Sequence, residues 1–158
     1  MAGIVLSFRQ EHKDRRANLA AGGTVRGRDV ASILIADDDP NILRALAFLM
    51  HEQGHNVRTV VDGEAALQAI AEAPPELVLL DVMMPKRNGY DVCRALRANP
   101  HFARLRIVML TAKGRDSDRR AGLDLGVDAY LTKPFAIRDV VGCIADVLAT
   151  GPQPAAGH

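Results

Sequence analysis

Between residues 32 and 149 the chain alternates, five times over, a short apolar run with a segment of helical periodicity. The runs are apolar at consecutive positions, so both faces of each predicted strand must be buried. Strands of this kind occur in parallel sheets whose two faces are covered by the connecting helices. The pattern therefore predicts an α/β domain with a doubly wound, five-stranded parallel sheet. The predicted strands are 33–36, 56–61, 77–82, 106–111 and 127–132, and the predicted helices are 43–50, 63–73, 90–98, 116–125 and 137–148.

Composition divides the chain into three parts. Of the 158 residues, 48% are apolar and 25% are charged. A chain of this length and composition can bury one hydrophobic core. Residues 1–31 carry six basic and three acidic side chains, and the last segment is rich in Pro, Gly and Ala. We therefore expect a flexible N-terminal extension (1–31), one folded domain (32–149) and a flexible tail (150–158). Because only eight residues follow Thr150, we expect no effector domain in this chain.

Charge and cysteine content exclude several classes of protein. The net charge of +1 gives no bulk reason to bind nucleic acid or an anionic membrane surface. No apolar run reaches the roughly 18 residues that a membrane span needs. Cys93 and Cys143 lie far apart in the sequence and form no C-x-x-C motif, which favours a reduced, cytoplasmic location. A secreted disulfide scaffold and a membrane protein are therefore not expected.

Polar residues of complementary charge end the predicted strands. Asp37 and Asp38 follow the first strand, Asp81 lies at the end of the third, Thr111 ends the fourth and Lys133 follows the fifth. In an open parallel sheet the carboxyl ends of the strands meet at one edge, and ligands bind there. The sequence thus predicts carboxylates, a hydroxyl and an ammonium group around one site.

Clustered carboxylates need compensation. Two unit charges about 4 Å apart repel by roughly 4 kcal/mol at an effective dielectric constant near 20. A raised pKa or a bound cation relieves this repulsion. Carboxylate oxygens with room for water and phosphate oxygens suit Mg²⁺ better than Zn²⁺. We therefore expect a phosphoryl pocket with a carboxylate nucleophile and Mg²⁺ as cofactor.

Four segments resemble the signature segments of the response-regulator receiver domain of two-component signalling. They are ILIADDDP, LVLLDVMMPKRNGYDVC, IVMLTA and GVDAYLTKPF, and they occur in the family's order within residues 32–149. The resemblance implies a flavodoxin-like (βα)5 fold with strand order 2-1-3-4-5. It also implies a signalling phosphoacceptor that is not an enzyme and catalyses only its own phosphorylation and dephosphorylation.

The resemblance assigns roles to the acidic residues. It implies that Asp81 is the phosphoacceptor, attacking the phosphorus of a kinase phosphohistidine. It implies that Asp38 and Asp81 ligate Mg²⁺ together with the backbone carbonyl of Met83, whereas Asp37 acts mainly through water.

The resemblance also assigns roles to the remaining strand-end residues. Lys133 pairs with the phosphoryl group and, at rest, with Asp81, and a cis peptide bond precedes Pro134. Thr111 hydrogen-bonds the phosphoryl group, and Tyr130 changes rotamer as Thr111 moves. Phosphorylation then shifts an equilibrium and repacks the face made by the fourth helix, fifth strand and fifth helix.

The implied partners are a sensor histidine kinase or a histidine phosphotransfer protein and an unknown downstream protein. Met83 and Lys113 occupy positions that vary in the family and affect phosphoryl lifetime, and we expect no rapid self-dephosphorylation. Asp128-Ala129 departs from the doubled acid that often precedes this tyrosine in DNA-binding regulators. We therefore expect a monomer or a weak phosphorylation-dependent dimer.

Other readings remain open from the sequence alone. Asp37 and Asp38 could simply cap the first predicted helix, although Asp39, which precedes Pro40, is the more favourable cap. Tyr130 is as well explained by core packing as by switching. His51 and His55 are four residues apart, but Gly54 should end the helix between them, which disfavours a metal pair.

Two other function classes share parts of this pattern. A haloacid-dehalogenase-type phosphatase also uses an Asp nucleophile and Mg²⁺, but Asn41 stands where that family requires Thr or Val. A flavodoxin-like cofactor binder needs a phosphate loop after the first strand, where three aspartates would repel the phosphate.

Overall fold

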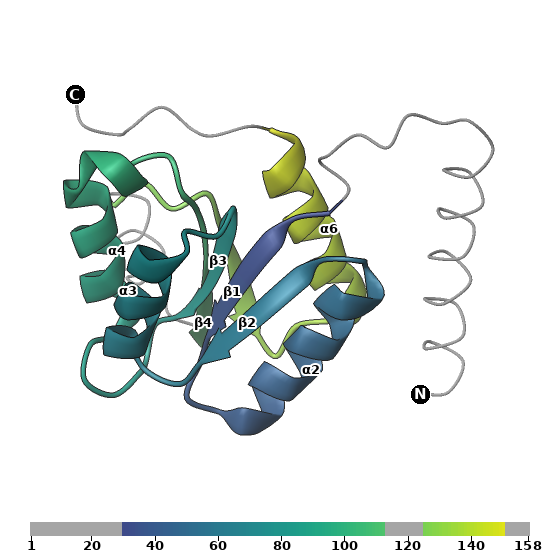
Figure 1. The fold of residues 1–158 in the computed structure, drawn as a ribbon. Helices are drawn as coiled ribbons and strands as arrows, with labels where there is room; N and C mark the ends of the chain where they lie inside the picture. Colours follow the sequence, from purple (N-terminus) through teal and green to yellow (C-terminus); the bar gives the residue numbers. More distant parts are fainter. Residues whose placement is uncertain (1–29, 113–124, 151–158) are drawn as a thin grey trace.

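A computed structural model describes residues 30–112 and 125–150, and it contains one five-stranded parallel sheet (Figure 1). The strand order is β2-β1-β3-β4-β5, so the predicted fold class and strand order are confirmed. The sheet order reverses direction between β1 and β3, which places a topological switch point at the centre of its carboxyl edge. The strands are β1 (Ser32–Ala36), β2 (Asn56–Val60), β3 (Leu77–Asp81), β4 (Arg106–Ala112) and β5 (Ala129–Lys133).

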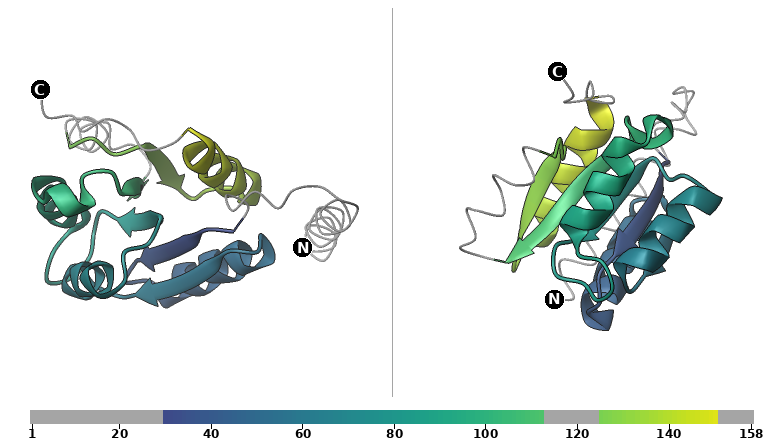
Figure 2. Two further views of the ribbon diagram at one scale, coloured as in Figure 1. Left: turned by 45° about the horizontal axis from the view of Figure 1, so that its top comes forward. Right: turned by 90° about the vertical axis from the view of Figure 1, so that its left-hand side faces the viewer.

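Helices cover both faces of the sheet (Figure 2). One layer contains α2 (Pro40–Glu52) and α6 (Ile137–Ala149), and the other contains α3 (Gly63–Glu72) and α4 (Gly89–Ala98). A short 3-10 helix, η1 (Pro100–Phe102), follows α4. The helix predicted at 116–125 falls almost entirely outside the described residues, as do Lys113 and most of the predicted N-terminal extension and tail. None of the helices in the described ranges is long and apolar enough to cross a membrane.

The sheet is apolar on both sides because each central strand packs into two cores. All five residues of β3 are buried. Leu77 and Leu79 pack into the layer of α2 and α6, whereas Val78 and Leu80 pack into the layer of α3 and α4. This alternation explains the continuous apolar run in the sequence and fixes the register of β3.

Polar side chains set the starts of the helices. Asp39 caps α2 by accepting from the Asn41 backbone N–H at 2.9 Å, and Asp62 caps α3 by accepting from Ala65 N–H at 2.7 Å. The cap at Asp39 was predicted from the sequence. Asn88, which was not predicted as a cap, does the same for α4. In each cap a side-chain oxygen accepts a hydrogen bond from a backbone N–H of the first turn, which has no partner within the helix.

Several boundaries differ from the sequence prediction. The last strand begins at Ala129 rather than at residue 127, because the Asp128 carboxylate accepts the Ile107 N–H at 2.7 Å at the point where β5 approaches β4. The histidine pair does not form a metal site on α2, because the helix ends at Glu52. His55 Nδ1 instead accepts the Ala31 N–H at 3.0 Å.

Candidate functional site

The strand-end residues named above meet at the carboxyl edge of the sheet. Asp81 is the last residue of β3, and Asp37 and Asp38 follow β1 directly. Lys133 is the last residue of β5, and Thr111 lies one residue before the end of β4. Parallel pairing of four neighbouring strands therefore gathers these side chains from distant parts of the sequence.

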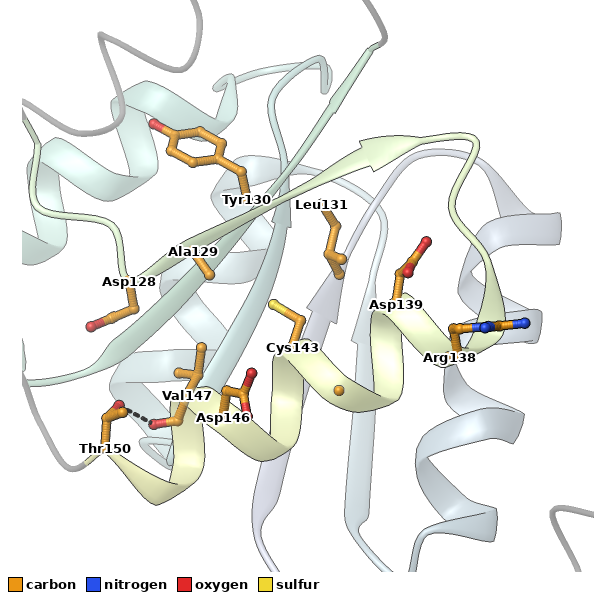
Figure 3. A pocket seen from close by; sticks show the side chains of 11 residues that line it. Asp128, Ala129, Tyr130, Leu131, Arg138, Asp139, Cys143, Asp146, Val147 and Thr150 are labelled. Carbon is orange, nitrogen blue, oxygen red and sulfur yellow. Dashed lines mark hydrogen bonds between the residues drawn. The ribbon is translucent and has the colours of Figure 1, made fainter.

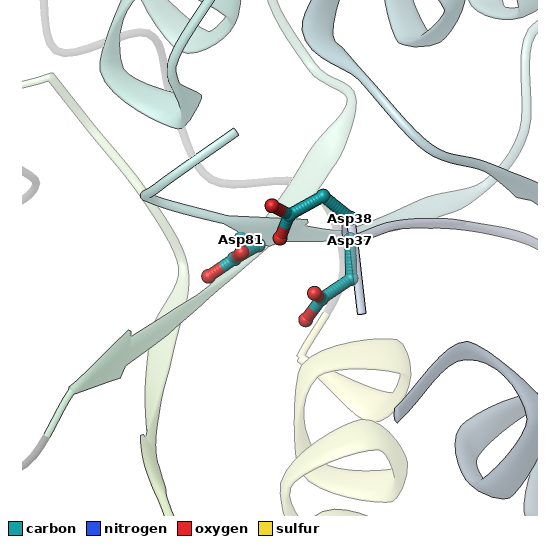
Figure 4. A group of neighbouring side chains, drawn as sticks. All are labelled: Asp37, Asp38 and Asp81. Carbon is teal, nitrogen blue, oxygen red and sulfur yellow. The ribbon is translucent and has the colours of Figure 1, made fainter. Parts of the chain in front are cut away.

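Three carboxylates form the acidic part of the site (Figure 4). Asp37, Asp38 and Asp81 each offer an oxygen, and these oxygens all lie within 4.8 Å of one another. Asp37 and Asp81 are buried, with 0% and 5% of their surface exposed, whereas Asp38 is exposed. The cluster is thus open to solvent on the side of Asp38, where an ion can enter.

Lys133 is the cation of the site. Its Nζ lies 2.8 Å from Asp37 Oδ2 and 3.2 Å from Asp81 Oδ1, so one ammonium group bridges two buried carboxylates. The sequence analysis expected only the partner Asp81, and the shorter contact is to Asp37. Asp37 also accepts the Asp39 N–H at 2.9 Å, which fixes its carboxylate beside the start of α2. The peptide bond before Pro134 is cis, as the family resemblance implied.

Burial and charge shift the pKa values of this cluster. Burial, reinforced by the negative charge of Asp37, raises the pKa of Asp81 to about 6, although the ammonium group of Lys133 works in the opposite direction. Burial alone would lower the pKa of Lys133, but its hydrogen bond to Asp37 and the charges of both carboxylates raise that pKa above its ordinary value. Lys133 therefore stays charged. Its single positive charge cannot neutralise all three carboxylates of the site.

Thr111 and Tyr130 lie on one face of neighbouring strands. Thr111 is buried, and it pairs in register with Thr132, while Tyr130 pairs with Met109. Because side chains alternate along a strand, Thr111 and Tyr130 share a face two positions apart. Tyr130 is half-buried and packs against the core between the sheet and the layer of α3 and α4. This position is compatible with core packing and with rotamer exchange.

The start of α4 packs against the strand end at Gly89, a residue that the sequence analysis did not single out. A Cβ atom at Gly89 would lie 2.4 Å from the Asp81 carbonyl oxygen, so only glycine fits there. In the loop that follows Asp81, Met83 is 60% exposed and Lys86 has a φ of 67°. The sequence feature that could have identified Gly89 is its position directly after the cap Asn88, at the first residue of a helix that packs against the end of β3.

Comparison with known proteins places this geometry in a family. Residues 33–145 match the family model of the response regulator receiver domain. The chain is 38% identical over 122 residues to the sensory transduction protein RegX3 of Mycobacterium tuberculosis, a match that covers 77% of this chain and 52% of RegX3. It is 44% identical over 109 residues to the DNA-binding response regulator MtrA of Mycolicibacterium smegmatis, covering 69% of this chain and 46% of MtrA. The chain thus spans about half the length of these curated relatives.

Solved structures agree with the sequence matches. A putative response regulator from Chloroflexus aurantiacus superposes with a TM-score of 0.73 at 36% identity, covering 75% of this chain and 98% of that one. The chemotaxis response regulator CheY4 of Vibrio cholerae superposes with a TM-score of 0.71 at 26% identity, with the same two coverages. Since the family model spans most of the described domain and the strand order is the expected one, this chain belongs to the receiver-domain family of two-component response regulators.

Proposed function

We propose that this receiver accepts a phosphoryl group on the carboxylate of Asp81, in a Mg²⁺-dependent reaction, from a sensor histidine kinase or a histidine phosphotransfer protein. The observation that carries the proposal is the position of Lys133 Nζ, 2.8 Å from Asp37 and 3.2 Å from Asp81. A buried carboxylate beside a fixed ammonium group and an open acidic rim is the arrangement that phosphoryl transfer to a carboxylate needs.

The proposed reaction forms an acyl phosphate. An Asp81 carboxylate oxygen attacks the phosphorus of a phosphohistidine, the P–N bond breaks, and the imidazole leaves with the bonding pair and takes up a proton. Lys133 then pairs with a phosphoryl oxygen in addition to the Asp37 carboxylate, and the Thr111 hydroxyl donates a hydrogen bond to a second phosphoryl oxygen. Lys133 also helps to keep Asp81 ionised, because it opposes the effect of burial on the pKa of that residue.

The donor set of the site fits Mg²⁺. Oxygens of Asp37, Asp38 and Asp81 converge within 4.8 Å, and hard carboxylate oxygens are the ligands that this ion prefers. Asp38 and Asp81 would hold the ion with the Met83 backbone carbonyl, and Asp37 would act through water. When bound, the ion neutralises charge on the carboxylates and on the incoming phosphoryl oxygens.

Phosphorylation would be read out on the face that contains β5 and α6. Thr111 and Tyr130 share one face of β4 and β5, so movement of Thr111 toward the phosphoryl group opens space for the Tyr130 ring. A ligand that favours one arrangement shifts the population of both. The downstream partner would bind this altered face, as would a second copy in a weak phosphorylation-dependent dimer.

Intact mass spectrometry tests the proposal. The parent is incubated with acetyl phosphate and Mg²⁺, and we expect one phosphoryl adduct that survives acid and is lost in base. Asp81→Asn should form none. The matched control is Asp39→Asn, which changes an acid one position beyond the cluster and keeps a good helix cap. This control should still form the adduct.

Three results would count against the proposal. They are the absence of an adduct together with no beryllium fluoride complex, an adduct that persists in Asp81→Asn, and loss of the adduct in Asp39→Asn alone. Steady release of phosphate from many small phosphoesters would instead favour the phosphatase class.

A further inference from the structure

The junction between β2 and α3, residues 60–64, contacts two chain segments that border the acidic site. The carbonyl oxygen of Val60 accepts a hydrogen bond from the Asp37 N–H at 3.2 Å. The Gly63 N–H donates to the carbonyl oxygen of Pro85 at 3.5 Å. Asp37 belongs to the carboxylate cluster, and Pro85 belongs to the loop between β3 and α4. One short junction therefore connects the carboxylates to this loop.

Gly63 packs against the loop more closely than a residue with a side chain could. A Cβ atom at this position would overlap the carbonyl oxygen of Arg87 and would lie 2.7 Å from the Arg87 Cβ. Gly63 is buried and is the first residue of α3. Among the described residues the glycines with positive φ are Gly54 and Gly126, so Gly63 has an ordinary backbone conformation. Glycine is required here by the close approach of the loop.

Two ion pairs lie on either side of this contact. Asp62 pairs with Lys86 at 3.6 Å, and Glu64 pairs with Arg87 at 2.7 Å. The Asp62 carboxylate is held in place because it also caps α3 through the Ala65 N–H. Lys86 and Glu64 are both more than half exposed, so these pairs contribute little to the stability of the whole domain. Both pairs join the start of α3 to the loop, so their effect is expected to be local.

The loop depends on this support because its backbone conformation is unfavourable. Lys86 has a φ of 67°, which residues other than glycine seldom adopt. The Arg87 N–H donates to the Pro85 carbonyl oxygen across it at 2.7 Å, which makes a tight γ-turn. Such conformations persist where the surrounding structure holds them. The base of the loop is closed by a hydrogen bond from Gly89 N–H to Val82 O at 2.8 Å, whereas the γ-turn is held by α3.

We infer that Gly63, Asp62 and Glu64 are positioning residues that hold the loop between β3 and α4 in place for metal binding. The inference rests on the proposed function, in which the Met83 backbone carbonyl ligates Mg²⁺. Met83 lies between two buried residues of the loop, so its backbone has little freedom once the γ-turn is fixed. Because the same junction bonds the Asp37 N–H, it also sets the position of the loop relative to the carboxylates.

The first test compares two substitutions of glycine by alanine. The dissociation constant of Mg²⁺ is obtained from the dependence of the melting temperature on Mg²⁺ concentration in the full, unphosphorylated chain. Gly63→Ala must displace the loop and should weaken Mg²⁺ binding about tenfold, as changes next to metal ligands do. The matched control is Gly142→Ala, at the groove between β5 and α6 (Figure 3), where a Cβ atom would meet nothing within 4 Å.

Gly142→Ala should bind Mg²⁺ with the parental affinity. An unchanged dissociation constant in Gly63→Ala, or an equal loss of affinity in both variants, would overturn the inference. Should Gly63→Ala fail to fold, the second test decides alone.

The second test removes one ion pair and leaves the glycines in place. Arg87→Gln loses the pair with Glu64, and its Mg²⁺ dissociation constant should rise about threefold, within the range for one exposed ion pair. Charge alone predicts the opposite change, because removing a positive charge near a cation site favours the cation. The matched control is Arg94→Gln, which loses the same charge from a pair with Asp91 inside α4. Its affinity should not fall, and unchanged or tighter binding in Arg87→Gln would contradict the positioning role.

Hydrogen exchange in EDTA examines the loop without Mg²⁺ or a phosphoryl donor. In Arg87→Gln the backbone amides of residues 83–89 should exchange about threefold faster than in the parent, while those of β1 and β3 keep the parental rates. Faster exchange spread evenly over the domain would mean a general loss of stability and would overturn the inference. If melting of the parent does not respond to Mg²⁺, the proposed function fails, and faster exchange confined to the loop would still support the role of the junction in positioning it.

Discussion

Replacement of Asp81 by Asn should stabilise the metal-free protein in a pH-dependent way. Burial and the charge of Asp37 raise the pKa of Asp81 from 3.8 to about 6. The folded state therefore binds this proton more tightly than the unfolded chain does. The resulting contribution to stability is fully present below about pH 4 and is lost as the pH rises through about 6.

The size of the effect follows from the pKa shift. A difference of about two pKa units at about 1.36 kcal/mol each gives about 3 kcal/mol between pH 4 and pH 8. The side chain of Asp81 is only 7% exposed, so solvent screening reduces this value little. Asparagine carries no titrating proton, so the variant should lack this pH-dependent loss.

Urea unfolding followed by circular dichroism in EDTA measures the difference. The free energy of unfolding is determined for both proteins at several pH values from 4 to 8, and the parental value is subtracted from that of Asp81→Asn. Other titrating groups are common to both proteins and largely cancel. We expect the difference to rise by about 3 kcal/mol across this range. A difference that does not change with pH, or that falls, would refute the electrostatic account of the site.

Four further substitutions test individual contacts by thermal melting. Asp38→Ala should raise the melting temperature in metal-free buffer, because it relieves repulsion among the carboxylates. It should also abolish the stabilisation by Mg²⁺, which for the parent is about 2.7 kcal/mol at a Mg²⁺ concentration of 100 times Kd. A lower melting temperature with a retained Mg²⁺ response would show that the ion binds elsewhere. Lys133→Met leaves two buried carboxylates without their cation and should cost about 3–5 kcal/mol at pH 8 and less at pH 5, so an equal loss at both pH values would contradict the bridging role. Gly89→Ala should cost about 1–3 kcal/mol because its Cβ would lie 2.4 Å from the Asp81 carbonyl oxygen, whereas Gly142→Ala, with nothing within 4 Å, should stabilise α6 by up to about 1 kcal/mol.

The layout of the site was predictable because it depends on strand ends. Four consecutive apolar residues before Asp81 are explained by burial on both faces of β3. Once the sheet is parallel, the residues that end its strands must meet at one edge, whatever their separation in the sequence. The sequence therefore placed Asp37, Asp81 and Lys133 together without any information on the helices.

The details that were not predicted depend on contacts between loops. The start of β5 is set by the Asp128 carboxylate, which accepts the Ile107 N–H and lies 3.6 Å from Arg97. No local pattern in the sequence reveals that an acid at a strand start is used in this way. Gly89 is likewise required by the Asp81 carbonyl, a contact that exists only after β3 and α4 have packed together.

The preference of Lys133 for Asp37 gives the site a specific resting state. With its Nζ at 2.8 Å from Asp37 and 3.2 Å from Asp81, Lys133 offers one positive charge to a cluster of three carboxylates. The shorter contact holds the ammonium group beside Asp37, which is completely buried. The longer one leaves Asp81 incompletely neutralised, in keeping with its raised pKa. Phosphorylation of Asp81 would therefore let Lys133 gain a phosphoryl contact without giving up Asp37, so that this ion pair serves as the fixed point around which the rest of the site rearranges.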